Sequence, residues 1–134
     1  PGGLLAVFAH VYDPPPPVAE AFATVFRKVV PDSPLNAAPP RPARDIYQTM
    51  FTTFADGIRE TTGFGEPEQL RFDWERYYSR ADWLDLLPTT GGLTRLSPDE
   101  LAEVLEEVGA AIDTLGGGFT MTYTTMALTT SLTT

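Results

Sequence analysis

Six consecutive residues near the start of the chain, Leu4 to Ala9, carry no polar side chain. A run this short and this apolar is typical of a strand buried on both faces, as in a sheet with helices on each side. Two glycines precede the run, and Asp13 with four consecutive prolines follows it. We therefore expect a strand over Leu4–Val11 that needs neighbours on both of its edges.

The remaining sequence predicts helices and strands in a regular order. The strongest local signal is Leu96-Ser97-Pro98-Asp99-Glu100-Leu101, in which Ser97 and Glu100 match a capping box and Pro98 stands at the first helical position. Apolar residues at helical spacing, or alternating with polar residues, predict the other elements. Helices are expected at about residues 14–30, 43–61, 80–87 and 98–115, and further strands at 68–78 and 119–128.

Composition excludes several functional classes. The chain has 134 residues, which suits one domain, and its net charge of −9 disfavours binding to nucleic acid because phosphate backbones require a basic face. It has no cysteine, and no His, Asp and Glu cluster has metal-ligand spacing. The longest apolar run is too short to cross a bilayer. We therefore expect a cytoplasmic protein with no metal, no nucleic-acid partner and no membrane partner.

Several motifs together resemble a known family. A Pro1-Gly2-Gly3 turn enters the apolar strand, a helical insertion follows, and the chain ends strand–helix–strand. The stretch Trp83–Pro88, followed by Ser97-Pro98-Asp99-Glu100, is similar to bacterial small-molecule members. In these features the chain resembles the C-terminal half of a class I S-adenosylmethionine-dependent methyltransferase.

The resemblance implies an α/β fold, the C-terminal portion of a Rossmann-like seven-stranded methyltransferase sheet. Its three strands would lie with the last one antiparallel in the middle, flanked by helices. Residues 1–13 would form a buried strand, residues 14–66 a helical insertion or lid, and residues 67–134 the strand–helix–strand ending. The activity implied is methyl transfer from S-adenosylmethionine to a small-molecule acceptor.

The elements that bind the cofactor in this family are not found in the chain. They are a Gly-rich turn after the first strand of the sheet and an acidic residue that ends the second. Gly63-Phe64-Gly65 and Gly116–Gly118 both follow predicted helices, where glycines are typical helix stops. We therefore expect no cofactor-binding residue in this chain, an isolated chain without activity, and an N-terminal half missing from this sequence.

Three residues are candidates for the wall of the acceptor pocket. His10 ends the first strand, where ligands bind in open α/β sheets, and a histidine there can act as a general base or orient a substrate. Tyr12 lies close by, and Tyr47 lies on a helix that the resemblance places over the acceptor. Alternatively, His10 is a hydrogen-bonded wall residue and Tyr47 belongs to the core. No catalytic residue can be assigned.

A different class of function stays open. The chain can instead be a non-catalytic α+β module that binds a small ligand or assembles through its sheet. In either case the outer edge of Leu4–Val11 carries no lysine or other charge, and such an edge recruits another segment. The expected partner is the missing N-terminal half or a second copy of the chain.

Overall fold

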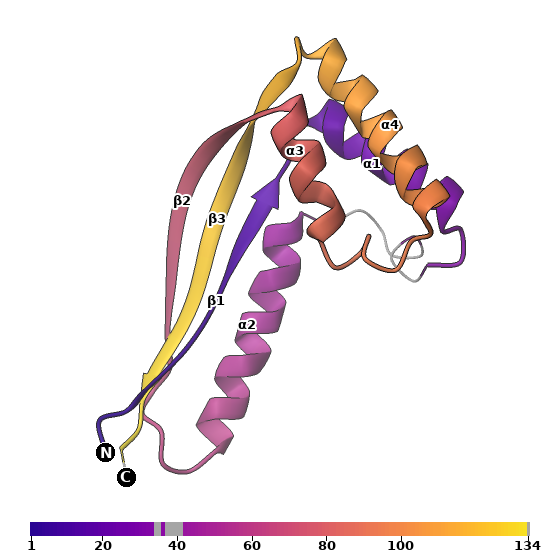
Figure 1. Cartoon of the computed structure of the whole chain (residues 1–134). Helices are drawn as coiled ribbons and strands as arrows, with labels where there is room; N and C mark the ends of the chain where they lie inside the picture. The colour runs from indigo at the N-terminus through magenta and orange to yellow at the C-terminus, as the bar shows by residue number, and fades with distance from the viewer. Residues whose placement is uncertain (34–35, 37–41, 134) are drawn as a thin grey trace. The chain divides into compact units, whose positions relative to one another are not determined.

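A computed structural model describes residues 1–33, 36 and 42–133 (Figure 1). The elements, in chain order, are β1 (Leu4–Asp13), α1 (Pro16–Val29), α2 (Ala43–Glu60), β2 (Glu68–Ser79), α3 (Arg80–Leu86), the 3-10 turn η2 (Leu87–Thr89), α4 (Pro98–Thr114) and β3 (Gly118–Ser131). This order confirms the predicted succession of helices and strands. Residues 34–35 and 37–41 of the predicted lid region lie outside the described residues.

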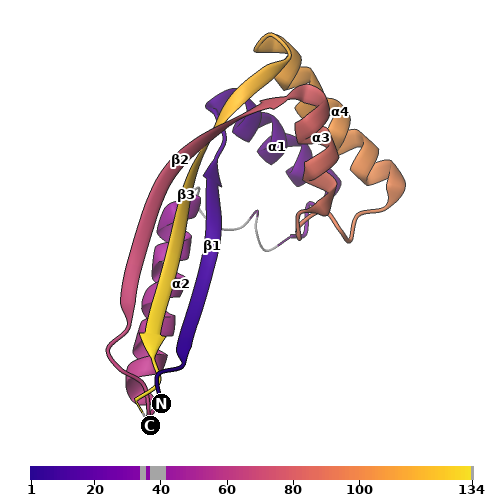
Figure 2. The same ribbon diagram turned by 60° about the vertical axis from the view of Figure 1, so that its left-hand side comes forward.

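The three strands form one antiparallel sheet with β3 in the middle. The strand order is β1-β3-β2, and β1 pairs with β3 from Leu4 opposite Ser131 to Asp13 opposite Thr122 (Figure 2). The prediction that the last strand lies in the middle, antiparallel to its neighbours, is therefore confirmed. The strands β1 and β2 are the two edges of this sheet.

The chain divides into two compact units. The first consists of Pro1–Asp13, Arg41–Glu75 and Thr122–Thr134, and the second of Pro14–Pro40 and Arg76–Met121. The first unit therefore holds β1, α2 and the larger parts of β2 and β3. The second holds α1, α3 and α4 with the adjoining strand ends.

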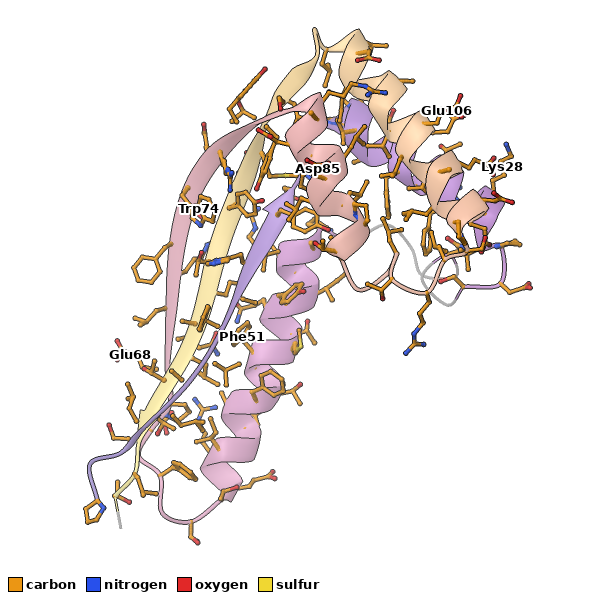
Figure 3. The ribbon with its side chains drawn as sticks, viewed as in Figure 1. Lys28, Phe51, Glu68, Trp74, Asp85 and Glu106 are labelled. Carbon is orange, nitrogen blue, oxygen red and sulfur yellow. The ribbon has the colours of Figure 1, made fainter. Side chains whose placement is uncertain are left out.

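Helix α2 packs on one face of the sheet in the first unit. The buried cluster joins residues of β1, α2 and β3, namely Val11, Phe51, Ala55, Met126 and Leu128. Because successive strand residues point to opposite faces, Val7 and Ala9 pack against the same cluster as Val11. Figure 3 labels Phe51 on the side of α2 that faces the strands.

The opposite face of the sheet in the first unit exposes large apolar side chains. Phe8 of β1 is 67% exposed and Phe72 of β2 is 58% exposed. Among the described residues of this unit, β1 is therefore covered on one face, whereas the sequence predicted burial on both. The apolar side of β2 also lies on this open face, while its polar side faces α2, where Gln48 donates to Gln69.

The second unit has its own core. Helices α1 and α4 pack together, and both bury apolar stripes, which the helical spacing predicted. An aromatic cluster joins β2, α3 and β3: the Trp83 ring centroid lies 5.2 Å from that of Tyr78 and 5.6 Å from that of Phe119. Trp83 is thus a core anchor, as expected from its size.

Helix α4 begins with the predicted capping box. The Glu100 backbone nitrogen donates to Ser97 Oγ over 3.2 Å, and the Ser97 backbone nitrogen donates to Glu100 Oε1 over 2.9 Å. At the other end, Gly116 and Gly117 have φ values of 94° and 91°, a conformation that favours glycine. Both ends of α4 are therefore fixed by residues that the sequence identifies.

Replacing Ser97 by alanine removes the side-chain acceptor of the capping box. We expect Ser97→Ala to lower the free energy of unfolding by about 1 kcal/mol, measured by urea denaturation. Thr94→Ala is the matched control, because the exposed Thr94 hydroxyl donates to the Gly91 carbonyl and caps no helix. Equal unfolding midpoints for wild type and Ser97→Ala would contradict the capping box.

The same box makes stability depend on pH. The backbone N–H of Ser97, and then its side chain, hold the pKa of Glu100 below its ordinary value. A lowered folded-state pKa stabilises the fold above the unfolded-state pKa of about 4.3, and this contribution is lost as the pH falls. Glu100→Gln should therefore destabilise the protein at pH 7 and have a smaller effect at pH 3. A destabilisation equal at both pH values, measured by denaturant titration, would refute this assignment.

Candidate functional site

The open face of the first unit gathers aromatic side chains from all three strands. The pairing of β1 with β3 sets His10 opposite Thr125 and Tyr12 opposite Tyr123. Trp74 of β2 reaches the same face, where its ring stacks on that of Tyr123. We call this set the aromatic patch: Phe8, His10, Tyr12, Trp74 and Tyr123.

The hydroxyl of Thr125 links two residues of the patch. Trp74 Nε1 donates to Thr125 Oγ1 over 2.8 Å, and His10 Nδ1 lies 2.7 Å from the same oxygen. An indole N–H can only donate, so the Thr125 oxygen accepts from Trp74 and keeps a proton and a lone pair for His10. Thr125 can therefore hold the imidazole in either neutral tautomer, with Nε2 as the ring nitrogen left for a ligand.

Ring contacts fix the patch in place. The rings of Trp74 and Tyr123 are stacked, with centroids 4.1 Å apart and planes at 9°. His10 meets Trp74 edge-on at 5.6 Å, and Tyr12 meets Tyr123 edge-on at 6.3 Å. These are the arrangements that aromatic pairs favour. The patch is thus an ordered aromatic surface that suits the flat side of an apolar or aromatic molecule.

The structure places two of the three residues predicted for the acceptor wall on the open face and the third on the α2 side. His10 and Tyr12 share the open face, whereas Tyr47 packs against the buried cluster beneath α2, the alternative placement that the sequence left open. Partial burial raises the pKa of Tyr12, and the nearby Tyr47 phenol raises it further. The Tyr12 phenol is therefore neutral at pH 7. A role for these residues in binding an acceptor stays a prediction.

A carboxylate lies on the other side of the sheet. Thr124 Oγ1 donates to Asp73 Oδ1 over 2.9 Å, and Arg71 Nε lies 3.5 Å from the same oxygen. The hydrogen bond from Thr124, and then the charge of Arg71, lower the pKa of Asp73. An Arg71–Asp73 ion pair is therefore present, and Asp73 is held as a satisfied carboxylate rather than as a base.

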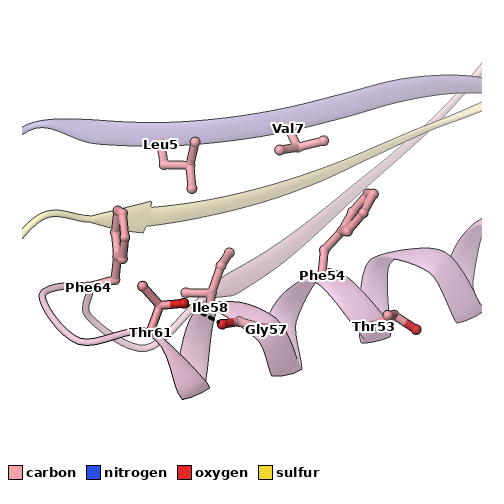
Figure 4. A pocket seen from close by; sticks show the side chains of 8 residues that line it. All are labelled: Leu5, Val7, Thr53, Phe54, Gly57, Ile58, Thr61 and Phe64. Carbon is pink, nitrogen blue, oxygen red and sulfur yellow. Dashed lines mark hydrogen bonds between the residues drawn. The ribbon is translucent and has the colours of Figure 1, made fainter.

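An apolar pocket lies between β1 and α2 (Figure 4). Its volume is about 360 Å³, and its uncharged lining consists of Leu5, Val7, Thr53, Phe54, Gly57, Ile58, Thr61 and Phe64. No pattern in the sequence predicted this pocket. The one signal in the sequence was Gly57, a glycine in the interior of a predicted helix, where this residue is unfavourable.

The glycine motifs singled out in the sequence do not fit S-adenosylmethionine where the structure describes them. Gly63 and Gly65 follow α2, and Gly116 and Gly117 follow α4, so neither motif makes the strand–turn–helix that holds a nucleotide-like cofactor. In the described part of the chain, no three His, Cys, Asp or Glu side chains gather in a way that could hold a metal ion. Across the same residues, no helix combines the length and apolarity needed to cross a membrane.

Comparison with known proteins finds no matching family model and no matching curated protein.

The network around Thr125 can be tested with two neighbouring variants. Thr125→Val keeps the side-chain shape but removes the acceptor of the Trp74 indole proton, so exchange of this proton with solvent should become faster. Thr124→Val is the matched control: it should leave the indole exchange unchanged and raise the pKa of Asp73, which loses its main hydrogen bond. NMR spectra of the indole and carboxyl groups report both effects.

The buried Trp83 provides an internal reference in the same spectra. If Thr125→Val changed the exchange of both indole protons equally, or of neither, the hydrogen bond from Trp74 to Thr125 would be contradicted.

Proposed function

We propose that this chain is the acceptor-side part of a Rossmann-like methyltransferase that transfers a methyl group from S-adenosylmethionine to a small molecule. The observation that carries the proposal is the strand order β1-β3-β2 with the last strand antiparallel in the middle. The methyltransferase resemblance implied this order from the sequence. The same sequence supplies the Pro-Gly-Gly entry to β1 and the strand–helix–strand ending.

The residues of this chain would act on the acceptor. Methyl transfer depends on holding the acceptor in line with the methyl group, so positioning supplies much of the catalysis. His10 and Tyr12 would form the wall against which an uncharged acceptor lies, with Tyr47 as the neighbour of Tyr12 on the α2 side. The cofactor would be held by strands outside this sequence, because the described residues do not fit it.

A non-catalytic assembly module is the second candidate. The observation that favours it is the pairing of an uncharged outer edge of β1 with an apolar pocket beside α2. In this case no cofactor site is needed anywhere. The coding sequence before Pro1 distinguishes the two candidates: a strand followed by a Gly-rich turn favours the enzyme, and a start codon directly before Pro1 favours the module.

Calorimetry with S-adenosylmethionine tests the proposal. The 134-residue chain should show no binding in the micromolar range, whereas the product extended by the residues encoded before Pro1 should bind. Tight one-site binding by the 134-residue chain would contradict the location of the cofactor elements outside it. An extended product that does not bind would contradict the methyltransferase.

In the extended product, His10→Ala should raise the KM for the acceptor several-fold and leave the cofactor Kd unchanged. Arg95→Ala, an exposed substitution in the second unit, is the control. Equal loss of cofactor and acceptor binding in His10→Ala would assign His10 to the structure of the sheet rather than to the acceptor wall.

A further inference from the structure

We propose that the outer edge of β1 and the adjoining flank of α2 form a two-fold interface between two copies of the 134-residue chain. This interface uses the same edge of β1 as the proposed methyltransferase sheet. In a longer product, the strands that carry the cofactor would take that edge, so the dimer is expected of the 134-residue chain alone. Its test measures mass rather than methyl transfer.

The two edges of the sheet differ in charge. The strand β2 carries acidic and basic side chains along its length, namely Glu68, Arg71, Asp73, Glu75 and Arg76. In β1, the segment from Leu4 to Val11 has no Asp, Glu, Lys, Arg or Pro. Charged side chains and proline are the usual guards against edge-to-edge pairing. Of the two edges, the outer edge of β1 is therefore the one that can pair with another strand.

The flank of α2 beside this edge is also uncharged and apolar. Ile46, Met50 and Phe54 are spaced by four residues and are 49%, 37% and 42% exposed. Residues four apart lie on one side of a helix, so these three form a stripe. Phe54 lines the apolar pocket together with Leu5 of β1, so the stripe and the strand edge belong to one continuous surface (Figure 4).

Gly57 lies on the same flank, and the fold of the chain itself does not require it. Its φ is not positive, and a Cβ added to it would meet nothing within 4 Å. A glycine in a helix interior costs roughly 0.5–1 kcal/mol relative to alanine. Close approach of a second backbone from outside the chain would explain a glycine at this position.

A second copy supplies what this surface lacks. The surface needs an extended apolar strand and, on the α2 side, an apolar helix flank. A two-fold axis perpendicular to the sheet pairs β1 antiparallel with the same strand of the partner and sets the two α2 helices side by side on one face. An isologous contact requires such self-complementarity.

The stripe lies on the side of α2 that is next to β1. Phe54 lines the pocket with Leu5 of β1, whereas Gln48, on another side of the helix, donates to Gln69 of β2. In a two-fold pair, the two stripes would therefore face each other across the new strand pair.

The size of the surface is also sufficient. The strand edge is about 30 Å long, and the sheet together with the helix on its face is about 20 Å thick. Each copy would therefore contribute about 600 Å², so the two copies would bury about 1,200 Å² together. Specific protein interfaces begin at about this area. The net charge of −9 does not oppose the contact locally, because neither β1 from Leu4 to Val11 nor the stripe carries a charge.

The alternation of faces restricts the register. Residues that lie opposite each other in an antiparallel pair point to the same face of the sheet. At the two-fold axis, a residue of β1 must therefore lie opposite the same residue of the partner's β1. An axis at Phe8 pairs Phe8 with the partner's Phe8 on the open face, and Val7 with the partner's Ala9 on the α2 side. This register covers Leu4 to Tyr12 and buries the exposed Phe8 ring.

The first experiment measures mass by sedimentation velocity over a range of concentrations. The wild-type chain should sediment at about twice its monomer mass of 14.6 kDa. Met50→Lys should shift the dimer dissociation constant at least 10-fold upward. Thr52→Lys, at an exposed position on the Gln48 side of α2 and away from the stripe, should leave it unchanged. Both substitutions reduce the net negative charge equally, so repulsion between whole molecules cannot explain a difference.

The second experiment uses the absence of cysteine from the chain. Under mild oxidation, Phe8→Cys should form a disulfide-linked dimer, because the two Cys side chains face each other at the axis. Ala6→Cys, on the same face, should not, since its partner lies about 13 Å away along the strand. A wild-type chain that stays monomeric at 100 µM, or that forms open-ended aggregates, would overturn the proposal. Neither outcome would bear on methyl transfer.

Discussion

The antiparallel pairing of β1 with β3 is the interaction on which the rest of the first unit depends. It joins residues separated by more than one hundred positions and fixes which side chains meet across the strands. This register sets Val7 opposite Leu128, which creates the surface that α2 covers, and sets His10 opposite Thr125 on the other face. A shift by one residue would exchange the two faces, so the buried cluster and the aromatic patch exist only in this register.

Local sequence signals predicted the elements of the fold well because their causes are local. The Ser97–Glu100 capping box and the glycines after α4 fix that helix within a few residues of the chain. The strand order came from the methyltransferase resemblance, and the structure confirms it. The covered face of the sheet could not be predicted: alternation in β2 shows that Phe72 and Trp74 share a side, but only the position of α2 determines that this side stays open.

In the candidate site, too, the sequence predicted single residues but not the contacts between distant segments. His10 was identified because the sequence predicted that it ends a strand. This was wrong, since β1 continues to Asp13, and the groups that hold His10, Thr125 and Trp74, come from two other strands. No local pattern connects residues that far apart. Gly57 is unusual for a different reason, because glycine is unfavourable in the interior of a helix. The pocket around it is formed by residues of both α2 and β1, so the sequence of α2 alone could not predict it. Both proposals therefore depend on contacts between distant segments.

Cross-strand nuclear Overhauser effects are the sharpest test of the register, because they report the pairing of β1 with β3 residue by residue. We expect contacts between Val7 and Leu128 and between Val11 and Thr124, and none between the backbones of β1 and β2, since β3 separates them. Direct backbone contacts between β1 and β2, or a β1–β3 register displaced by one residue, would contradict the fold, the aromatic patch and both proposals together.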